Sequence, residues 1–263
     1  MSRQILFIII VFFTQTANAD LRGLPNVTIL ASSSLTNPIT ELAIEYSRQK
    51  NITVTASYNS TAEQAWRIED GESADIFISS HPYWMASLKQ MGLIDVYSLT
   101  NLVKNKLVLI TSAKGKLNEY PIAAAGLEGK LENLGNRTIM SFGDPSNTAL
   151  GMYTKQAIEK LDEQNDTKLW ESLNAKTIKS LSSKNNLYLI AQGETAGIVY
   201  YSDARGNDEV RILNVVDENL HEPIIYQAAV VAGENMAHAR DFLEFIQKEE
   251  SKQVFKKHGF IID

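Results

Sequence analysis

Short runs of β-branched and apolar residues alternate along this chain with longer stretches in which apolar residues recur every three or four positions. The short runs predict strands, and the longer stretches predict amphipathic helices. Strands are expected at 27–30, 52–57, 75–79, 107–111, 138–142, 197–200, 210–215 and 225–231. Helices are expected at 35–46, 61–70, 81–91, 151–161, 187–192 and 237–257. Such alternation is typical of α/β proteins whose mainly parallel sheets are covered by helices.

The N-terminal segment has the pattern of a signal peptide. Arg3 supplies a positive charge, residues 5–13 are apolar, and Ala-Asn-Ala at 17–19 is a cleavage site of the A-x-A type. The apolar run is too short to cross about 30 Å of hydrocarbon as a helix. We therefore expect cleavage after Ala19. The chain has no cysteine to carry a lipid, so we expect a mature protein in the periplasm without membrane insertion.

A mature chain of this length predicts two domains, although no linker rich in proline or glycine marks a boundary. A hinge is expected at 101–107, before the second sheet begins, and a return crossing near 222–227. The first lobe would then comprise residues 20–104 and 228–263, and the second lobe residues 105–227.

Charge and motifs exclude several classes of function. The net charge is −6 and no basic patch is visible, which argues against a nucleic-acid partner. An anionic ligand would have to be bound by local dipoles against the field of the whole protein. The sequence contains no H-E-x-x-H, G-x-S-x-G, G-x-G-x-x-G or Walker-type loop. A binding protein is therefore favoured over an enzyme.

Hydroxyl or turn residues stand between a predicted strand and a predicted helix at four places: 32–36, 60–61, 144–146 and 182–183. The first amides of a helix lack intrahelical partners and carry the positive end of its dipole, so hydroxyls beside them can bind an anion. Each cluster also suits an ordinary helix cap. Residues 60–64 contain two overlapping capping boxes, so one hydroxyl can cap while the other faces a ligand. Together the four places suggest one anion bound in a cleft.

Tyr200 ends the predicted strand 197–200. A tyrosine at the carboxyl end of a strand can offer its hydroxyl to the crevice in which α/β proteins bind ligands. It can equally pack its ring at the rim of a lobe. The sequence pattern leaves both alternatives open.

The order of landmarks resembles that of periplasmic molybdate-binding proteins, the substrate receptors of ABC importers. The landmarks are Val-Thr-Ile-Leu-Ala-Ser-Ser-Ser-Leu-Thr at 27–36, Ala-Asp-Ile-Phe-Ile-Ser at 74–79 with Trp84-Met85, Gly-Asp-Pro at 143–145, Gly-Ile-Val-Tyr-Tyr-Ser-Asp at 197–203, and Phe-Lys-Lys-His-Gly-Phe at 255–260. They cover nearly the whole mature chain. The resemblance implies a two-lobe, type II-like periplasmic binding protein that holds its ligand in the cleft between the lobes.

In this family a tetrahedral oxyanion is held by hydroxyls and amides, with no metal ion, cofactor or basic side chain. The resemblance implies that Ser34 and Thr61 give hydroxyl and amide, that Leu150 and Ser183 give backbone amides, and that Tyr200 gives its phenol. The chain departs from the family at three points. Threonine replaces the usual serine at 61, the loop 146–151 lacks the family's His-Val-Pro-Ala-Gly pattern, and Ser183 replaces a commonly apolar residue.

The resemblance further implies molybdate or tungstate as ligand, closure of the lobes on it, and a membrane permease as partner. A monomer is expected. A site made only of donors suits a fully deprotonated dianion, because monoprotonated phosphate brings a proton that needs an acceptor. Sulfate has the same charge and symmetry and is smaller, so a receptor for sulfate or another small oxyanion stays an alternative. A secreted hydrolase is a third, for which the sequence offers no evident base.

Overall fold

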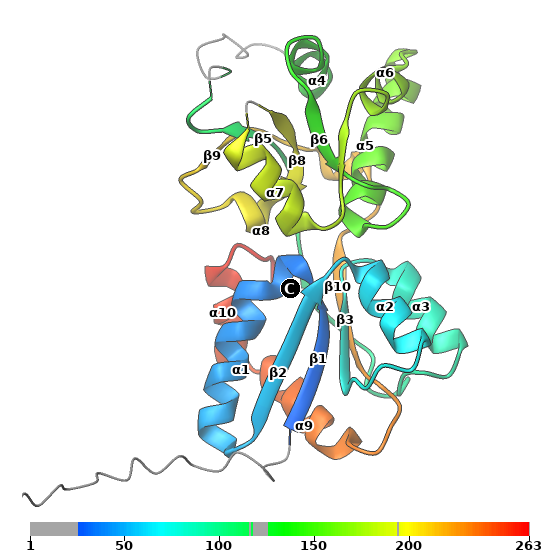
Figure 1. Cartoon of the computed structure of the whole chain (residues 1–263), viewed down its shortest axis with the longest axis vertical. Coiled ribbons are helices and arrows are strands. Elements are labelled where there is room, and N and C mark those ends of the chain that lie inside the picture. The colour runs from blue at the N-terminus through cyan, green and yellow to red at the C-terminus, as the bar shows by residue number, and fades with distance from the viewer. Residues whose placement is uncertain (1–25, 116, 118–125, 194, 263) are drawn as a thin grey trace, which may run out of the picture.

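The computed structural model describes residues 26–115, 117, 126–193 and 195–262. The expected signal peptide and its cleavage site lie outside these residues. Two mixed five-stranded sheets, each flanked by helices, form two lobes, with lobe 1 below lobe 2 in Figure 1. This arrangement confirms the predicted α/β, two-lobe architecture.

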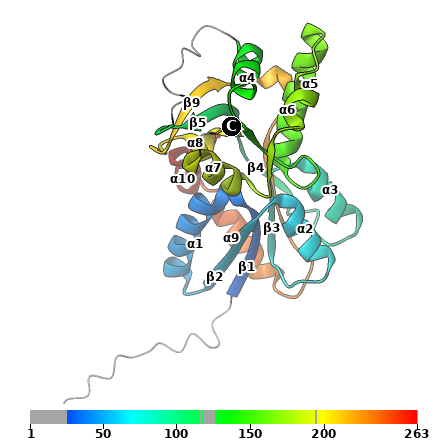
Figure 2. The same ribbon diagram turned by 45° about the horizontal axis from the view of Figure 1, so that its top comes forward.

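Lobe 1 has the strand order β2-β1-β3-β10-β4. β1 pairs in parallel with β2 and β3, and β10 pairs antiparallel with β3 and β4, so only β10 runs against the other strands. Helices α1, α9 and α10 lie together on one side and α2 and α3 on the other (Figures 1 and 2). The elements are β1 (Asn26–Ser32), η1 (Ser33–Leu35), α1 (Thr36–Lys50), β2 (Thr53–Asn59), α2 (Thr61–Glu69), β3 (Ile76–Ser79), α3 (Pro82–Gln90), β4 (Thr100–Lys104), β10 (Ile225–Val230), α9 (Met236–Ile246) and α10 (Glu249–Lys257).

Lobe 2 repeats this plan with the order β7-β6-β8-β5-β9. β6 pairs in parallel with β7 and β8, while β5 runs antiparallel to β8 and β9. Each sheet therefore has one reversed strand in the fourth position. The elements are β5 (Leu107–Ser112), α4 (Leu127–Gly135), β6 (Met140–Gly143), α5 (Ala149–Asn165), α6 (Leu169–Asn174), β7 (Ile178–Ser180), α7 (Ser183–Gln192), β8 (Ala196–Tyr200), α8 (Tyr201–Ala204), β9 (Val210–Val215) and η3 (Glu218–Leu220).

The chain passes between the sheets twice. The first crossing is Asn105–Lys106, between β4 and β5, and the second follows η3 and enters β10. The expected return segment of lobe 1 starts at residue 228, whereas β10, a strand of the first sheet, begins at Ile225. Residues 225–227 belong to the first sheet because Ile225 and Tyr226 already pair with Lys104 and Val103 of β4.

Several elements were not expected from the sequence. β7 has three residues, two of them exposed, and α6 and α8 are short. The expected helix 237–257 is two helices, because Lys248 has extended backbone angles (φ −64°, ψ 155°). Ser251 donates its hydroxyl to the Phe245 carbonyl at 2.7 Å and stabilises this break. Among the described residues, no helix is long and apolar enough to cross a membrane.

Gly197 of β8 supports a prediction about packing in lobe 2. A Cβ there would meet the Ser141 carbonyl oxygen and the Ile190 side chain. Because backbone must move to admit it, Gly197→Ala should lower the free energy of unfolding by about 1–3 kcal/mol in urea titrations. Gly233→Ala, whose Cβ meets open space, is the matched control and should change it by less than about 0.5 kcal/mol. Equal effects of the two substitutions would contradict the packing described.

Candidate functional site

The carboxyl end of β1 faces lobe 2, and η1 follows it at the boundary between the lobes (Figure 1). On the other side, α7 of lobe 2 lies against η1. Open α/β sheets bind ligands beyond the carboxyl ends of their strands. Polar side chains that meet at this boundary are therefore the candidates for a functional site.

Five buried hydroxyls of lobe 1 form a continuous set that we call the hydroxyl chain: Tyr226, Ser34, Ser32, Ser80 and Thr61. Ser34 Oγ lies 2.8 Å from the Tyr226 hydroxyl and 3.2 Å from Ser32 Oγ. Ser32 donates to Ser80 Oγ at 3.0 Å, and Ser80 Oγ lies 2.8 Å from Thr61 Oγ1. Each residue is at most 4% exposed. The structure thus brings two of the expected ligand-binding residues, Ser34 and Thr61, into one polar network.

At the start of α2, one hydroxyl residue caps the helix and the next one belongs to the hydroxyl chain. Ser60 is the N-cap and accepts the Glu63 amide at 3.1 Å. The hydroxyl of Thr61, the next residue, is left to bond Ser80 and also accepts the Ser80 amide at 3.1 Å. Ser60 is thus the hydroxyl that caps α2, and the hydroxyl of Thr61 is not used for capping. The second capping box is not formed, because Gln64 donates to strand carbonyls instead.

Ser34 has no capping role in the structure. The N-cap position of α1 is Leu35, which has no side-chain bond to the helix, and Thr36 Oγ1 donates to the Ser33 carbonyl at 2.7 Å. The Ser34 hydroxyl therefore takes part only in the hydroxyl chain.

Lobe 2 contributes two helix starts. Ser183 is the first residue of α7, which Ser182 caps by accepting the Asn185 amide. Leu150 is the second residue of α5, which Thr148 caps through the Gly151 amide. The amides of Ser183 and Leu150 belong to first turns, where intrahelical partners are lacking. Both are thus of the kind that binds an anion.

Tyr200 is buried at the end of β8, with 1% of its surface exposed. Its ring packs edge-on against Tyr226 at 6.1 Å between centroids. Among the described residues its buried hydroxyl has no hydrogen-bond partner. Burial raises the pKa of Tyr200 well above its usual value, the neighbouring Tyr226 adds to the rise, and the nearby Ser80 hydroxyl partly offsets it without reaching hydrogen-bond geometry. The phenol therefore stays protonated, and within the described part of the chain its proton has no acceptor.

Three residues at the boundary were not singled out from the sequence, Ser80, Tyr153 and Tyr226, and Ser33 was singled out only as part of the cluster 32–36. Ser33 Oγ lies 2.9 Å from Ser183 Oγ, and Tyr153 of α5 donates to the Ser80 carbonyl at 3.3 Å. Both bonds join the two lobes. Ser80 directly follows the end of a predicted strand, so it could have been predicted as a candidate by the argument used for the cluster that contains Ser34. Tyr153 and Tyr226 lie inside a helix and a strand, where the pattern gives no signal.

The side chains of the hydroxyl chain are all neutral, but the buried carboxylate of Asp203 in lobe 2 lies close enough to add to the rise that burial causes in the pKa of Tyr226 and of Tyr200. Lys184 contacts Asp203 at 2.8 Å and compensates its charge. Within the described part of the chain, no group of three or more His, Cys, Asp or Glu could hold a metal ion. The hydroxyl chain and the two helix starts therefore offer hydroxyl and amide donors.

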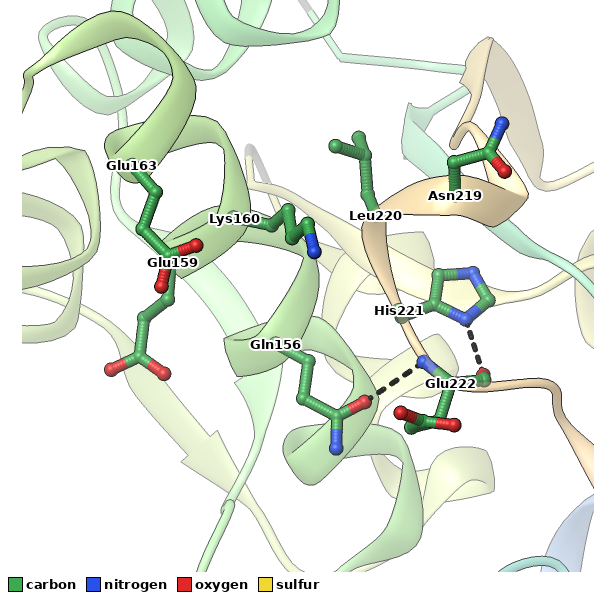
Figure 3. A pocket seen from close by; sticks show the side chains of 8 residues that line it. All are labelled: Gln156, Glu159, Lys160, Glu163, Asn219, Leu220, His221 and Glu222. Carbon is green, nitrogen blue, oxygen red and sulfur yellow. Dashed lines mark hydrogen bonds between the residues drawn. The ribbon is translucent and has the colours of Figure 1, made fainter.

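A surface cavity of about 340 Å³ lies away from the hydroxyl chain, between α5 and η3 (Figure 3). There the Glu222 amide donates to Gln156 Oε1 at 3.2 Å. The lining residues are Gln156, Glu159, Lys160, Glu163, Asn219, Leu220, His221 and Glu222. With three carboxylates against one lysine, this cavity does not suit an anion. The buried boundary between the lobes remains the candidate site.

The sequence model of bacterial extracellular solute-binding proteins matches residues 27–261. The chain belongs to this family. It is 32% identical over 237 residues to the molybdate-binding protein ModA of Haemophilus influenzae, with 89% of each chain covered. It is 30% identical over 237 residues to ModA of Escherichia coli, with 90% of this chain and 89% of the relative covered. The solved periplasmic molybdate-binding protein of Azotobacter vinelandii shares the fold, with a TM-score of 0.74, 18% identity and coverage of 90% and 99%.

The lobes of this solute-binding protein are in contact across the candidate site. Ser33 Oγ with Ser183 Oγ, and Tyr153 with the Ser80 carbonyl, are hydrogen bonds between the lobes at this site. The rings of His81 and Tyr153 also meet across the boundary, tilted by 40° with 4.8 Å between their centroids. These contacts hold lobe 1 and lobe 2 against one another at the candidate site.

His81 directly follows Ser80 of the hydroxyl chain, and its burial gives the stability of the fold a pH dependence. Its Nδ1 accepts the Tyr83 amide at 3.1 Å as the N-cap of α3. Burial lowers the pKa of His81 from 6.5 to about 4. The unfolded chain therefore binds a proton at a pH where the native protein does not, and stability falls as pH decreases from about 6.5 to about 4.

Replacing His81 with asparagine should flatten that dependence. Asparagine keeps a capping acceptor but does not titrate. Over this range the wild-type protein should lose about 1–3 kcal/mol more unfolding free energy than His81→Asn, measured in urea titrations at a series of pH values. Parallel pH profiles for the two proteins would show that His81 is not the group responsible.

Proposed function

We propose that this protein is a periplasmic receptor for molybdate, that it also binds tungstate, and that it delivers its ligand to the permease of an ABC importer. The family match and the two relatives named as molybdate-binding proteins support this proposal. The observation that carries it is the buried, neutral hydroxyl chain facing two helix N-termini of the opposite lobe. In this proposal the mature protein is a monomer without catalytic activity.

The proposed ligand-binding set combines both lobes. Ser34 and Thr61 provide hydroxyls and amides from lobe 1, while Leu150 and Ser183 provide amides and Tyr200 its phenol from lobe 2. All of these groups donate, and a dianion with four oxygens only accepts. Two first-turn amides add the positive ends of two helix dipoles, so charge is balanced without a basic side chain.

The same donors disfavour a protonated ligand and a hydrolytic reaction. Monoprotonated phosphate would place its own proton among donors, and an unmatched buried polar group costs about 1–3 kcal/mol. A serine nucleophile would need an adjacent base. The nearest imidazole, His81, already accepts the Tyr83 amide through Nδ1.

In the proposed mechanism, the two lobes close around the anion. Lobe 1 comprises residues 20–104 and 228–263, and lobe 2 comprises residues 105–227, except that residues 225–227 are counted with lobe 1 because β10 begins at Ile225. An anion that contacts both lobes stabilises the closed state in proportion to its preference for that state. The permease would then recognise the closed form.

Thermal unfolding in the presence of oxyanions tests the ligand. At about a thousand times its Kd, molybdate or tungstate should add about 4 kcal/mol of stability and raise the melting temperature of the wild-type protein by about 10 °C. Sulfate and phosphate at the same concentration should give much smaller shifts. The double variant Ser34→Ala, Tyr200→Phe should lose the molybdate shift. A large shift with sulfate alone would show that sulfate, and not molybdate, is the ligand. A full molybdate shift in the double variant would show that Ser34 and Tyr200 do not form the binding site.

Ser183 allows the backbone amide to be tested separately from the side chain. It is the first residue of α7 and follows Ser182, whose backbone is extended (φ −157°, ψ 165°), so proline fits there without breaking the helix. Ser183→Ala removes only the hydroxyl bond to Ser33 and should raise the molybdate Kd by about threefold. Ser183→Pro also removes the amide donor and should raise Kd by at least about tenfold more, in calorimetric titrations. Equal Kd values for the two variants would exclude this amide from the site.

A further inference from the structure

We propose that Tyr226 is a positioning residue for the oxyanion site, which donates its phenol proton to Ser34 and thereby leaves the Ser34 proton for the anion. The inference rests on the proposed function and adds to it a residue that does not itself touch the ligand. It also assigns a role to Asn105, at the crossing between the lobes, as the group that holds Tyr226.

The direction of the hydrogen bonds follows from counting protons. A hydroxyl donates once. Ser32 donates to Ser80, so the bond between Ser32 and Ser34 uses the proton of Ser34. The Ser34 oxygen can then only accept from Tyr226, 2.8 Å away. Every donation therefore runs from Tyr226 toward Ser80.

Asn105 fixes the beginning of this sequence of donations. Its amide nitrogen donates to the Tyr226 hydroxyl at 3.3 Å and to Ser202 Oγ at 2.8 Å. Its side-chain oxygen accepts the Lys106 amide at 2.9 Å, which sets the orientation of the amide group. Asn105 is 5% exposed and lies between β4 and β5. The crossing segment is thus connected through Tyr226 to Ser34.

The surroundings of Tyr226 keep its phenol protonated and in place. Its side chain is fully buried in β10, with Phe260 edge-on to the ring at 5.3 Å and Tyr200 at 6.1 Å. Burial raises the pKa of Tyr226 far above its usual value. The group that faces Ser34 is therefore a donor at every physiological pH.

Binding of an anion changes only one of these bonds. Ser34 turns its proton from Ser32 to the anion, while Tyr226 continues to donate to Ser34 and Ser32 continues to donate to Ser80. Successive hydrogen bonds polarise one another, so the donation from Tyr226 strengthens the one from Ser34. Without the phenol, the Ser34 oxygen loses its buried donor and its proton is less strongly directed.

The test is a double-mutant cycle between Tyr226→Phe and Ser34→Ala, with molybdate affinity measured by calorimetric titration. Tyr226→Phe should raise Kd by about five- to tenfold. In the Ser34→Ala background the same substitution should change Kd by less than about twofold, because the proposed effect acts through Ser34. If Ser34→Ala binds too weakly for titration, melting shifts at one fixed millimolar molybdate concentration give the same comparison.

Tyr46→Phe is the matched control. Tyr46 is as deeply buried, but among the described residues its hydroxyl has no hydrogen-bond partner, so this substitution should leave Kd unchanged in both backgrounds. Tyr226→Phe should fold, since Asn105 keeps Ser202 and Ser34 keeps Ser32 as partners.

Two results would overturn the role of Tyr226 while leaving the molybdate site intact: an unchanged Kd in Tyr226→Phe, or a penalty of equal size in the presence and absence of Ser34. Failure of the wild-type protein to bind molybdate would instead overturn the proposed function and this inference together.

Discussion

A hydroxyl group donates a single hydrogen bond, and the boundary between the lobes buries five hydroxyls in one connected set. The directions of their hydrogen bonds depend on one another. Because Ser32 donates to Ser80, Ser34 must donate to Ser32 and Tyr226 must donate to Ser34. Ser80 and Thr61 share the remaining protons, so one of the two has a hydroxyl proton without an acceptor inside the set. The phenol of Tyr200 also has no hydrogen-bond partner among the residues that the structure describes, and such a surplus of donors favours an anion over a cation at the boundary.

Capping and the proposed ligand binding use different residues at the starts of α2, α5 and α7. In each of these helices one residue caps the first turn with its side chain, and a residue one or two positions later lies at the boundary between the lobes. Ser60 precedes Thr61, Thr148 precedes Leu150, and Ser182 precedes Ser183. The cap holds the first turn in place at a contribution of about 1 kcal/mol, and the neighbouring groups keep their donors. The two uses of a hydroxyl cluster that compete in the sequence are assigned to separate residues in the structure.

The sequence predicted those features that depend on local pattern. Alternating strands and helices predicted α/β architecture, and the strand ends predicted the clusters 32–36 and 60–61. The family resemblance added the two-lobe form and the choice of Ser34 and Thr61, which the structure joins through Ser32 and Ser80. Tyr226 was out of reach, because its partners Ser34 and Asn105 are distant in sequence and no motif marks it within its strand. The start of β10 at Ile225 was predicted from the local pattern, but the lobe to which residues 225–227 belong was not, because pairing with β4 across more than a hundred residues decides it. The assignment of Ser34, Thr61, Leu150, Ser183 and Tyr200 to a ligand remains a prediction.

Ligand selectivity and closure have separate physical origins in this arrangement. The bonds from Ser33 to Ser183 and from Tyr153 to Ser80 join the lobes whichever solute lies between them. They stabilise the closed state equally for every ligand that fits, and a contribution common to all ligands cannot discriminate among them. Discrimination between oxyanions must therefore come from the donors themselves: their number, their fixed direction and the space they enclose. A residue that fixes donor direction, as Tyr226 does for Ser34, acts on selectivity even though it lies one bond away from the ligand.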